Sequence, residues 1–117
     1  MQAYDRENIN KTWDALRIVG KSLPDLMRNY NELLALNDWT PEQEKVFQEF
    51  INNLVLIVRT LQASTMRTTS LAWQKCLKVL EVFEEAIRSS QIIPAETAIQ
   101  MNSLFQEGLM EWDSEMN

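Results

Sequence analysis

The sequence predicts an all-α fold, an antiparallel bundle of four or five helices, from three observations. The 117 residues include only two glycines and three prolines, too few turn residues for the many short strands of a sandwich or a barrel. Apolar residues recur at helical spacing in every long segment. Hydrophobic residues make up 45% of the chain and charged residues 24%, which is typical of a globular protein with a core. We therefore expect a single domain spanning residues 1–117.

The first helix is expected over residues 5–36 and contains a proline. Its apolar stripe alternates spacings of three and four through Leu16, Val19, Leu23, Leu26, Tyr30 and Leu33. Pro24 lacks an N–H and clashes with the carbonyl four residues earlier, that of Gly20. The stripe keeps its phase through Pro24, which favours one long helix kinked near Gly20. In the alternative, Ser22 is an N-cap with Asp25 three residues later, and a second helix starts there.

The second helix has the clearest start in the chain. Thr40 is suited to the N-cap, Pro41 to the first helical position, and Gln43 completes a capping box. Ten of the sixteen residues from 46 to 61 are apolar, and nine of them cover about half of the helix circumference. We expect this to be the central helix of the bundle, with Leu56 alone pointing to the opposite side.

Two more helices complete the bundle. Residues 64–70 are rich in hydroxyl side chains and predict a turn, followed by a helix that ends near Ser89. Its stripe consists of Trp73, Cys76, Leu80, Phe83 and Ile87. Pro94 suits the first position of a last helix that runs to about Asp113. We expect that helix to bury Ala98, Met101, Phe105, Leu109 and Trp112.

The residue inventory excludes most catalytic and cofactor chemistry. The chain has no histidine, which removes the commonest general base and the commonest metal ligand. Cys76 is the only cysteine, so neither an intramolecular disulfide nor a multi-cysteine zinc site is predicted, and we expect it to be a small buried residue. Two distant glycines cannot form a phosphate-binding loop. We expect no cofactor, no metal and no enzymatic activity.

One enzyme class remains as an alternative. An all-α nucleotide pyrophosphohydrolase would hold Mg²⁺ with carboxylates spaced along its helices. Glu81 and Glu84 form an E-x-x-E pair, but the acidic pair that such a site requires on the next helix is missing. The interpretation that we favour places Glu81 and Glu84 on a solvated helix face.

Charge favours a protein partner over nucleic acid. The formal net charge is −6, and a small basic group of Arg67, Lys75 and Lys78 is outnumbered by seventeen acidic residues. Residues 89–117 carry five acidic residues and no basic one. Acidic charge beside apolar anchors suits a partner with a basic surface. The candidate partner-binding residues are Glu107, Met110, Glu111, Asp113 and Glu115. For this segment taken alone, the interpretation that we favour is a core helix with a solvated acidic face and a frayed tail.

The leading functional hypothesis is therefore a non-enzymatic protein-binding module, such as a small acidic inhibitor, an immunity protein, a chaperone or a regulatory subunit. Some apolar residues lie off the helix stripes, and their convergence on one surface would indicate a homodimer or a self-assembling structural subunit. They are Ile18, Leu36, Leu56, Leu77, Ile99 and Met110. The longest unbroken apolar run has five residues, against the ~20 of a membrane span. Because the N-terminal residues also lack a secretory signal, we expect a cytoplasmic protein.

Overall fold

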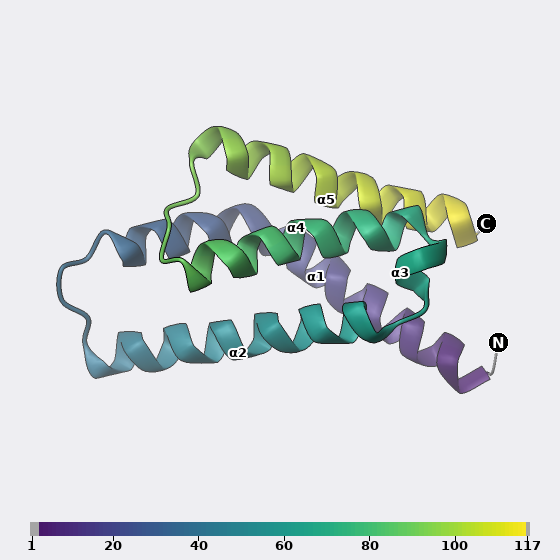
Figure 1. Ribbon diagram of the computed structural model, residues 1–117, viewed down its shortest axis with the longest axis horizontal. Coiled ribbons are helices and arrows are strands. Elements are labelled where there is room, and N and C mark those ends of the chain that lie inside the picture. The colour runs from purple at the N-terminus through teal and green to yellow at the C-terminus, as the bar shows by residue number, and fades with distance from the viewer. Residues whose placement is uncertain (1–2, 117) are drawn as a thin grey trace.

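The computed structural model describes residues 3–116, with side-chain burial for residues 7–115, and this part of the chain forms five helices and no strand. The helices are α1 (Ala3–Leu34), α2 (Pro41–Ala63), α3 (Met66–Thr69), α4 (Leu71–Arg88) and α5 (Ala95–Met116). In Figure 1, α1, α2, α4 and α5 run alternately in opposite directions, and α3 is a short turn between α2 and α4. The predicted all-α antiparallel bundle is confirmed.

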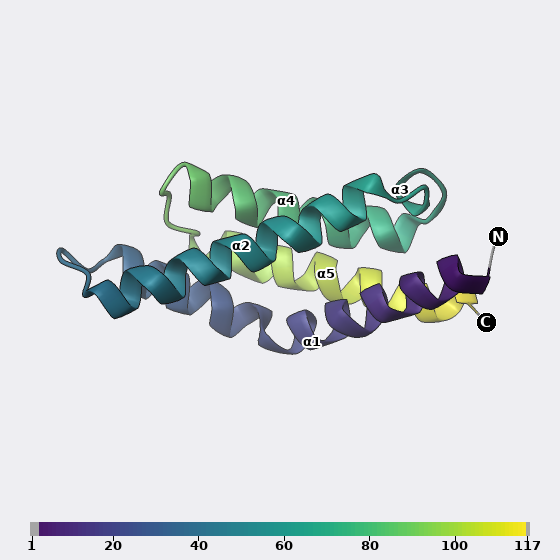
Figure 2. The same ribbon diagram turned by 90° about the horizontal axis from the view of Figure 1, so that it is seen from below.

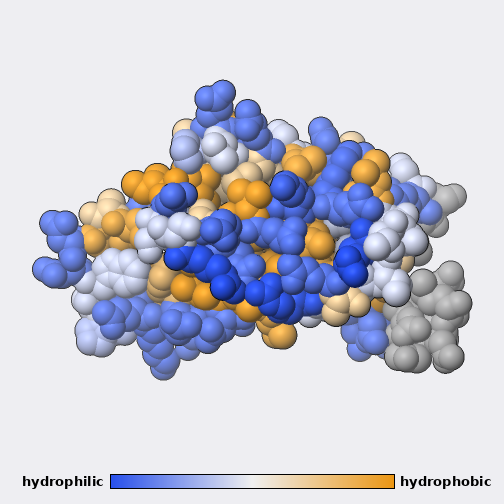
Figure 3. Space-filling view, in the orientation of Figure 1, coloured by the Kyte–Doolittle hydropathy of each residue, from blue (hydrophilic) through white to orange (hydrophobic). Residues whose placement is uncertain are grey.

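The surface carries apolar side chains as well as charged ones. On the face shown in Figure 3, hydrophobic residues form separate patches divided by hydrophilic residues. Large hydrophobic side chains that are exposed in the described part of the chain are Ile18, Leu36, Val46, Leu56, Leu71, Val82, Ile92, Ile99 and Met110. Within residues 3–116, no helix combines the length and the apolar character needed to cross a membrane.

Helix α1 continues through Pro24 as one helix, and Figure 2 shows it changing direction near its middle. The prediction of one long kinked helix is confirmed, and the alternative start at Ser22 is wrong. Pro24 cannot donate to the carbonyl of Gly20, so this carbonyl lacks its helical partner. Nε2 of Gln106 in α5 donates to it at 3.0 Å. A side chain from a neighbouring helix thus satisfies the group that the proline leaves free.

We expect Gln106→Ala to lower the free energy of unfolding by about 1 kcal/mol, because the partly buried Gly20 carbonyl loses its donor. In a Pro24→Ala background the backbone N–H at position 24 can supply that donor. The cost of Gln106→Ala should then fall by at least about half, which a double-mutant cycle from urea denaturation would measure. Equal costs in the two backgrounds would contradict the link between Pro24 and Gln106.

The start of α2 agrees with its sequence. Thr40 is the N-cap; its hydroxyl accepts from the backbone N–H of Gln43 at 3.1 Å, and its own N–H donates to Oε1 of Gln43 at 2.9 Å. Nε1 of Trp39 donates to the carbonyl of Leu33 at 2.9 Å. This bond ties the end of α1 to the start of α2, which fixes the α1–α2 connection at this end of the bundle.

The central helix is α4, and the prediction that α2 would be central is wrong. Helix α4 packs against both α2 and α5, and nine of its residues are buried. Its predicted stripe is buried throughout, at Trp73, Cys76, Leu80, Phe83 and Ile87. In α2 only Leu54, Val58 and Leu61 are buried. The apolar arc of α2 is therefore wider than the surface that α4 covers.

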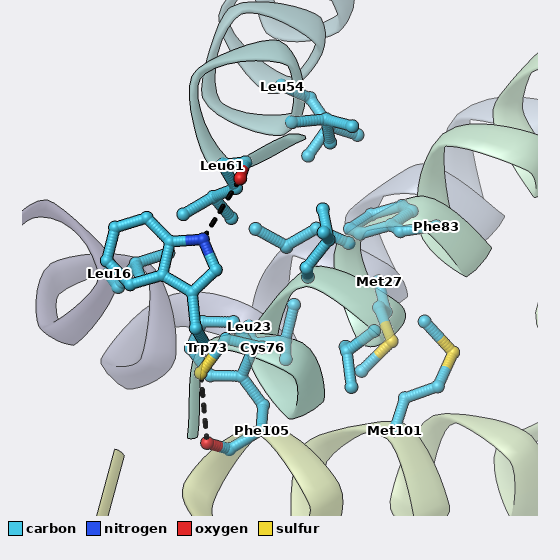
Figure 4. Packing of buried hydrophobic residues seen from close by; sticks show 14 of the residues in the cluster. Leu16, Leu23, Met27, Leu54, Leu61, Trp73, Cys76, Phe83, Met101 and Phe105 are labelled. Carbon is cyan, nitrogen blue, oxygen red and sulfur yellow. Dashed lines mark hydrogen bonds between the residues drawn. The ribbon is translucent and has the colours of Figure 1, made fainter. Parts of the chain in front are cut away.

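Two polar contacts cross the core between helices (Figure 4). Nε1 of Trp73 donates to the carbonyl of Leu61 at 3.0 Å, joining α4 to the last turn of α2. Sγ of Cys76 lies 3.8 Å from the carbonyl of Phe105 in α5. Cys76 is fully buried, as expected, and this burial raises the pKa of its thiol to about 12.

The connections before α4 and α5 differ in detail from the prediction. The predicted turn at residues 64–70 contains the short helix α3, and Ser70 caps α4 by accepting from the N–H of Trp73 at 3.1 Å. Pro94 lies one residue before α5 instead of at its first position, and its carbonyl accepts from the N–H of Ala98 at 2.9 Å. Helix α5 also extends past Asp113 to Met116.

Of the residues that α5 was expected to bury, Met101, Phe105 and Trp112 are buried, whereas Ala98 and Leu109 are partly buried. The loop before α5 is fixed by α1. The side-chain amide of Asn31 accepts from the N–H of Ile93 and donates to its carbonyl, both at 2.8 Å. Asn31 thus fixes the connection between α4 and α5 to the last third of α1.

Candidate functional site

Three of the predicted carboxylates of α5 pair with basic side chains of other helices. Lys75 of α4 lies 3.6 Å from Glu107 and also forms an ion pair with Glu111. The hydrogen bond to Glu111 is the main cause that raises the pKa of Lys75. Arg17 of α1 binds Asp113 at 2.5 Å. These intramolecular pairs reduce the negative charge that the face offers to a partner.

The remaining two candidates on α5 differ from one another. Glu115 accepts from the hydroxyl of Ser70 at 2.6 Å and from the N–H of Ala72 at 3.2 Å, so it helps to cap α4. Met110 is 70% exposed. Contact of these α5 residues with a partner stays a prediction, but four of the five have a role within the chain.

The E-x-x-E pair of α4 is divided between separate partners. Glu84 is buried, unlike the solvated position expected for it, and accepts from Arg59 at 3.3 Å and from Arg88 at 3.0 Å. Glu81 accepts from Gln62 at 2.8 Å. Among the described residues, no three histidine, cysteine or acidic side chains come close enough to hold a metal ion together. Both carboxylates act as links between α2 and α4.

The small basic group does not form a free basic surface. Arg67 and Lys78 are exposed, but Lys75 is engaged with the carboxylates of α5. A phosphate-binding surface needs several unpaired cations close together. Two separate cations give little support to nucleic-acid binding.

A more open apolar surface runs between α1 and α2. The backbones of these two helices make fewer close approaches than those of α4 and α5, α1 and α5, or α2 and α4. Three hollows of about 170, 180 and 250 Å³ follow this seam. We call them together the α1–α2 groove.

The three hollows lie in succession along the seam, and neighbouring hollows share lining residues. Leu26 and Phe50 line both the first and the middle hollow, and Ile57 lines both the middle and the last. The first hollow, at the α1–α2 loop, is lined by Leu26, Asn29, Tyr30, Leu33, Val46, Phe47 and Phe50. The middle hollow is lined by Val19, Leu23, Leu26, Phe50, Asn53, Leu54, Ile57, Leu80 and Phe83. The last hollow is lined by Lys11, Thr12, Ala15, Leu56, Ile57 and Thr60.

The groove leaves apolar side chains in contact with solvent along its length. Val46 near one end is 59% exposed and Leu56 near the other end is 67% exposed. Leu26, Phe50 and Ile57 between them are only partly buried. Continuous apolar surface of this kind is typical of interaction sites in a soluble protein.

The α1–α2 end of the bundle is strongly acidic. Residues 30–53 contain five carboxylates and one lysine, a net charge of −4. The carboxylates are all exposed, and none forms an ion pair with a side chain that the structure describes. They are Glu32, Asp38, Glu42, Glu44 and Glu49. Unpaired negative charge is therefore concentrated at this end of the bundle, whereas four of the five carboxylates of α5 have partners within the chain.

Another hollow, of about 350 Å³, lies between α1 and α5 beside Pro24. Its walls mix polar and apolar side chains, and its one charged group, Arg28, is paired with Asp25 at 2.6 Å. Ile99 lines this hollow, whereas Leu56 lines the α1–α2 groove. Leu77, counted among the apolar residues off the stripes, is buried. These off-stripe residues thus do not gather on one surface.

The sequence analysis missed the groove because it assigned the whole apolar arc of residues 46–61 to the core. The signal was the width of that arc, about half of the helix circumference, which exceeds what one packed neighbour covers.

Comparison with known proteins does not assign the chain to a family, because no family model, curated protein or solved structure matches it.

Proposed function

We propose that this protein is a non-catalytic binding module that receives an apolar segment of another protein in the α1–α2 groove. The observation that carries the proposal is the succession of three hollows between the two helices, lined mainly by apolar side chains that are partly exposed. A small inhibitor, an immunity protein, a chaperone and a regulatory subunit all act in this way, by docking on a partner.

Two further observations support the groove as the docking site. Four of the five carboxylates of α5 are engaged within the chain, and Met110 is the one apolar residue among the α5 candidates. In the groove, by contrast, the interrupting polar groups are mainly uncharged asparagine and threonine side chains. Their desolvation costs less than that of charged groups.

Site-specific photo-crosslinking in an extract of the source cells would test the proposal. A photoreactive residue is placed at position 46 or 56, at opposite ends of the groove, and at position 110 on α5 as the control. All three native side chains are exposed to a similar degree, so the replacements should leave the fold intact. We expect the same partner to be crosslinked from positions 46 and 56 and not from position 110.

The control separates the two surfaces. A partner crosslinked from position 110 alone would place the docking site on α5 and overturn the groove. Crosslinks between two copies of this chain from positions 46 and 56 would instead show that the groove mediates self-assembly. Heating or urea treatment before irradiation should abolish every specific adduct.

A further inference from the structure

The α1–α2 groove combines a length, a lining and a distribution of charge that together restrict what can occupy it. The chemistry of the partner that these features select rests on the proposed function.

The shape of the groove suits a helix. It follows α1 from Lys11 to Leu33, which is about 33 Å at the helical rise per residue. An amphipathic helix of up to about six turns can lie along such a seam, with apolar residues at i, i+3, i+4 and i+7 facing the two flanking helices. A short loop would cover only part of this length.

The charge beside the groove is concentrated at its loop end. Glu42 and Glu49 lie four residues before and three residues after Val46, so they flank it on the surface of α2. Glu32 lies three residues after Asn29, on the α1 side of the same hollow. All three carboxylates are exposed and form no ion pair with a described side chain.

Among the residues whose side chains the structure describes, the lining of the opposite end of the groove carries no carboxylate. Lys11 lines it and is paired with Glu7 at 3.6 Å, and the other lining residues are Thr12, Ala15, Leu56, Ile57 and Thr60. A partner that neutralises the loop end therefore needs its cations at one end only, and its remaining surface over the groove can be apolar.

We propose that the occupant of the α1–α2 groove is a basic amphipathic helix, whose lysine or arginine residues lie over Glu32, Glu42 and Glu49. Its apolar face covers Leu26, Phe50 and Ile57. Opposite charge steers the encounter and sets the orientation of the helix, while the apolar contacts hold it in place. The acidic residues at the loop end of the bundle then recognise the basic residues of the partner helix.

The test uses two designed, fluorescently labelled helical peptides with the same leucine pattern, one with lysines beside the apolar face and the other with glutamates. Fluorescence anisotropy at low salt should show the lysine peptide binding and the glutamate peptide binding at least about tenfold more weakly. Raising the salt concentration should weaken the binding of the lysine peptide and not that of the glutamate peptide.

Two triple variants with equal net charge localise the effect. E32Q/E42Q/E49Q removes the carboxylates beside the groove. It should lower the affinity for the lysine peptide about tenfold, because each exposed charge contributes roughly 0.5 kcal/mol to binding. E85Q/E96Q/E107Q removes exposed carboxylates of α4 and α5, again including one in the first turn of a helix, and should change the affinity less than about twofold. Equal losses in the two variants would overturn the proposal, because net charge alone would then explain the attraction.

Val46→Asn distinguishes groove binding from the requirement for a basic partner, because it makes the groove polar without changing its charge. If it weakens both peptides while E32Q/E42Q/E49Q weakens neither, groove binding stands and the basic partner is wrong. If it weakens neither peptide, both the basic partner and groove binding are wrong. A dimer in analytical ultracentrifugation that Val46→Asn dissociates would make a second copy the occupant, which also overturns the basic partner.

Discussion

Replacing Trp73 with alanine should lower the free energy of unfolding by about 3–5 kcal/mol, the range for removing a large buried aromatic side chain. The side chain is 1% exposed and its ring contacts those of Trp13 and Trp112, with centroids 5.7 and 6.3 Å away. Chemical denaturation followed by far-UV circular dichroism would measure the loss. A loss of this size approaches the whole stability of a small domain, so the variant is expected to be partly unfolded at room temperature.

A matched pair of phenylalanine variants tests the role of the indole N–H. Nε1 of Trp73 donates to the carbonyl of Leu61, whereas Nε1 of Trp13 is buried and has no hydrogen-bond partner in the part of the chain that the structure describes. Both rings lose a similar volume on replacement with phenylalanine. Trp73→Phe should therefore be more destabilising than Trp13→Phe by about 1 kcal/mol, the typical worth of one hydrogen bond. Equal losses would mean that packing alone accounts for the contribution of Trp73 to stability.

Local signals in the sequence predicted the helices well. The capping box at Thr40 and Gln43 lies within one turn, so its geometry does not depend on the rest of the fold. The apolar stripe of the first helix kept its phase through Pro24, and the helix is continuous there. Spacing along one helix is thus a reliable guide to which of its faces is buried.

Relations between helices were less predictable. The width of an apolar arc does not say which neighbours cover it, so α2 was expected at the centre, where α4 lies. The bond between Gln106 and the Gly20 carbonyl joins residues 86 positions apart, and no local pattern indicates it. The α1–α2 groove could not be predicted for the same reason. The sequence shows that both helices have apolar arcs, but it does not show that the two helices remain partly apart.

Charge illustrates the same point for the candidate site. The composition of residues 89–117 indicated a free acidic face on the last helix, but Lys75 and Arg17 reach it from α4 and α1. The carboxylates of residues 30–53 form no such pairs with described side chains. A count along the chain gives the charge of a segment, and only the packing of the helices shows where that charge remains unpaired.

The close approach of α5 to α4 at Gly108 should make Gly108→Ala strongly destabilising. Within a helix this change normally stabilises by about 1 kcal/mol. A Cβ atom at position 108 would lie 2.7 Å from Sγ of Cys76 and 3.1 Å from the carbonyl oxygen of Ala72. Because the Ala72 oxygen belongs to the backbone of α4, the two helices would have to separate. We expect a net loss of about 2 kcal/mol in the free energy of unfolding, measured by chemical denaturation.

Two comparisons separate this steric effect from a general intolerance of α5. Gly20→Ala brings its Cβ to 2.8 Å from Cδ1 of Leu109, the movable end of a flexible side chain, so it should cost less than Gly108→Ala. Cys76→Ala removes the sulfur nearest to position 108 and should reduce the cost of Gly108→Ala without abolishing it, because the Ala72 carbonyl remains. If the two changes were additive, the sulfur contact would be irrelevant. If Gly108→Ala were stabilising, α4 and α5 could not be in such close contact, and the packing that places Lys75 beside the carboxylates of α5 would be wrong with it.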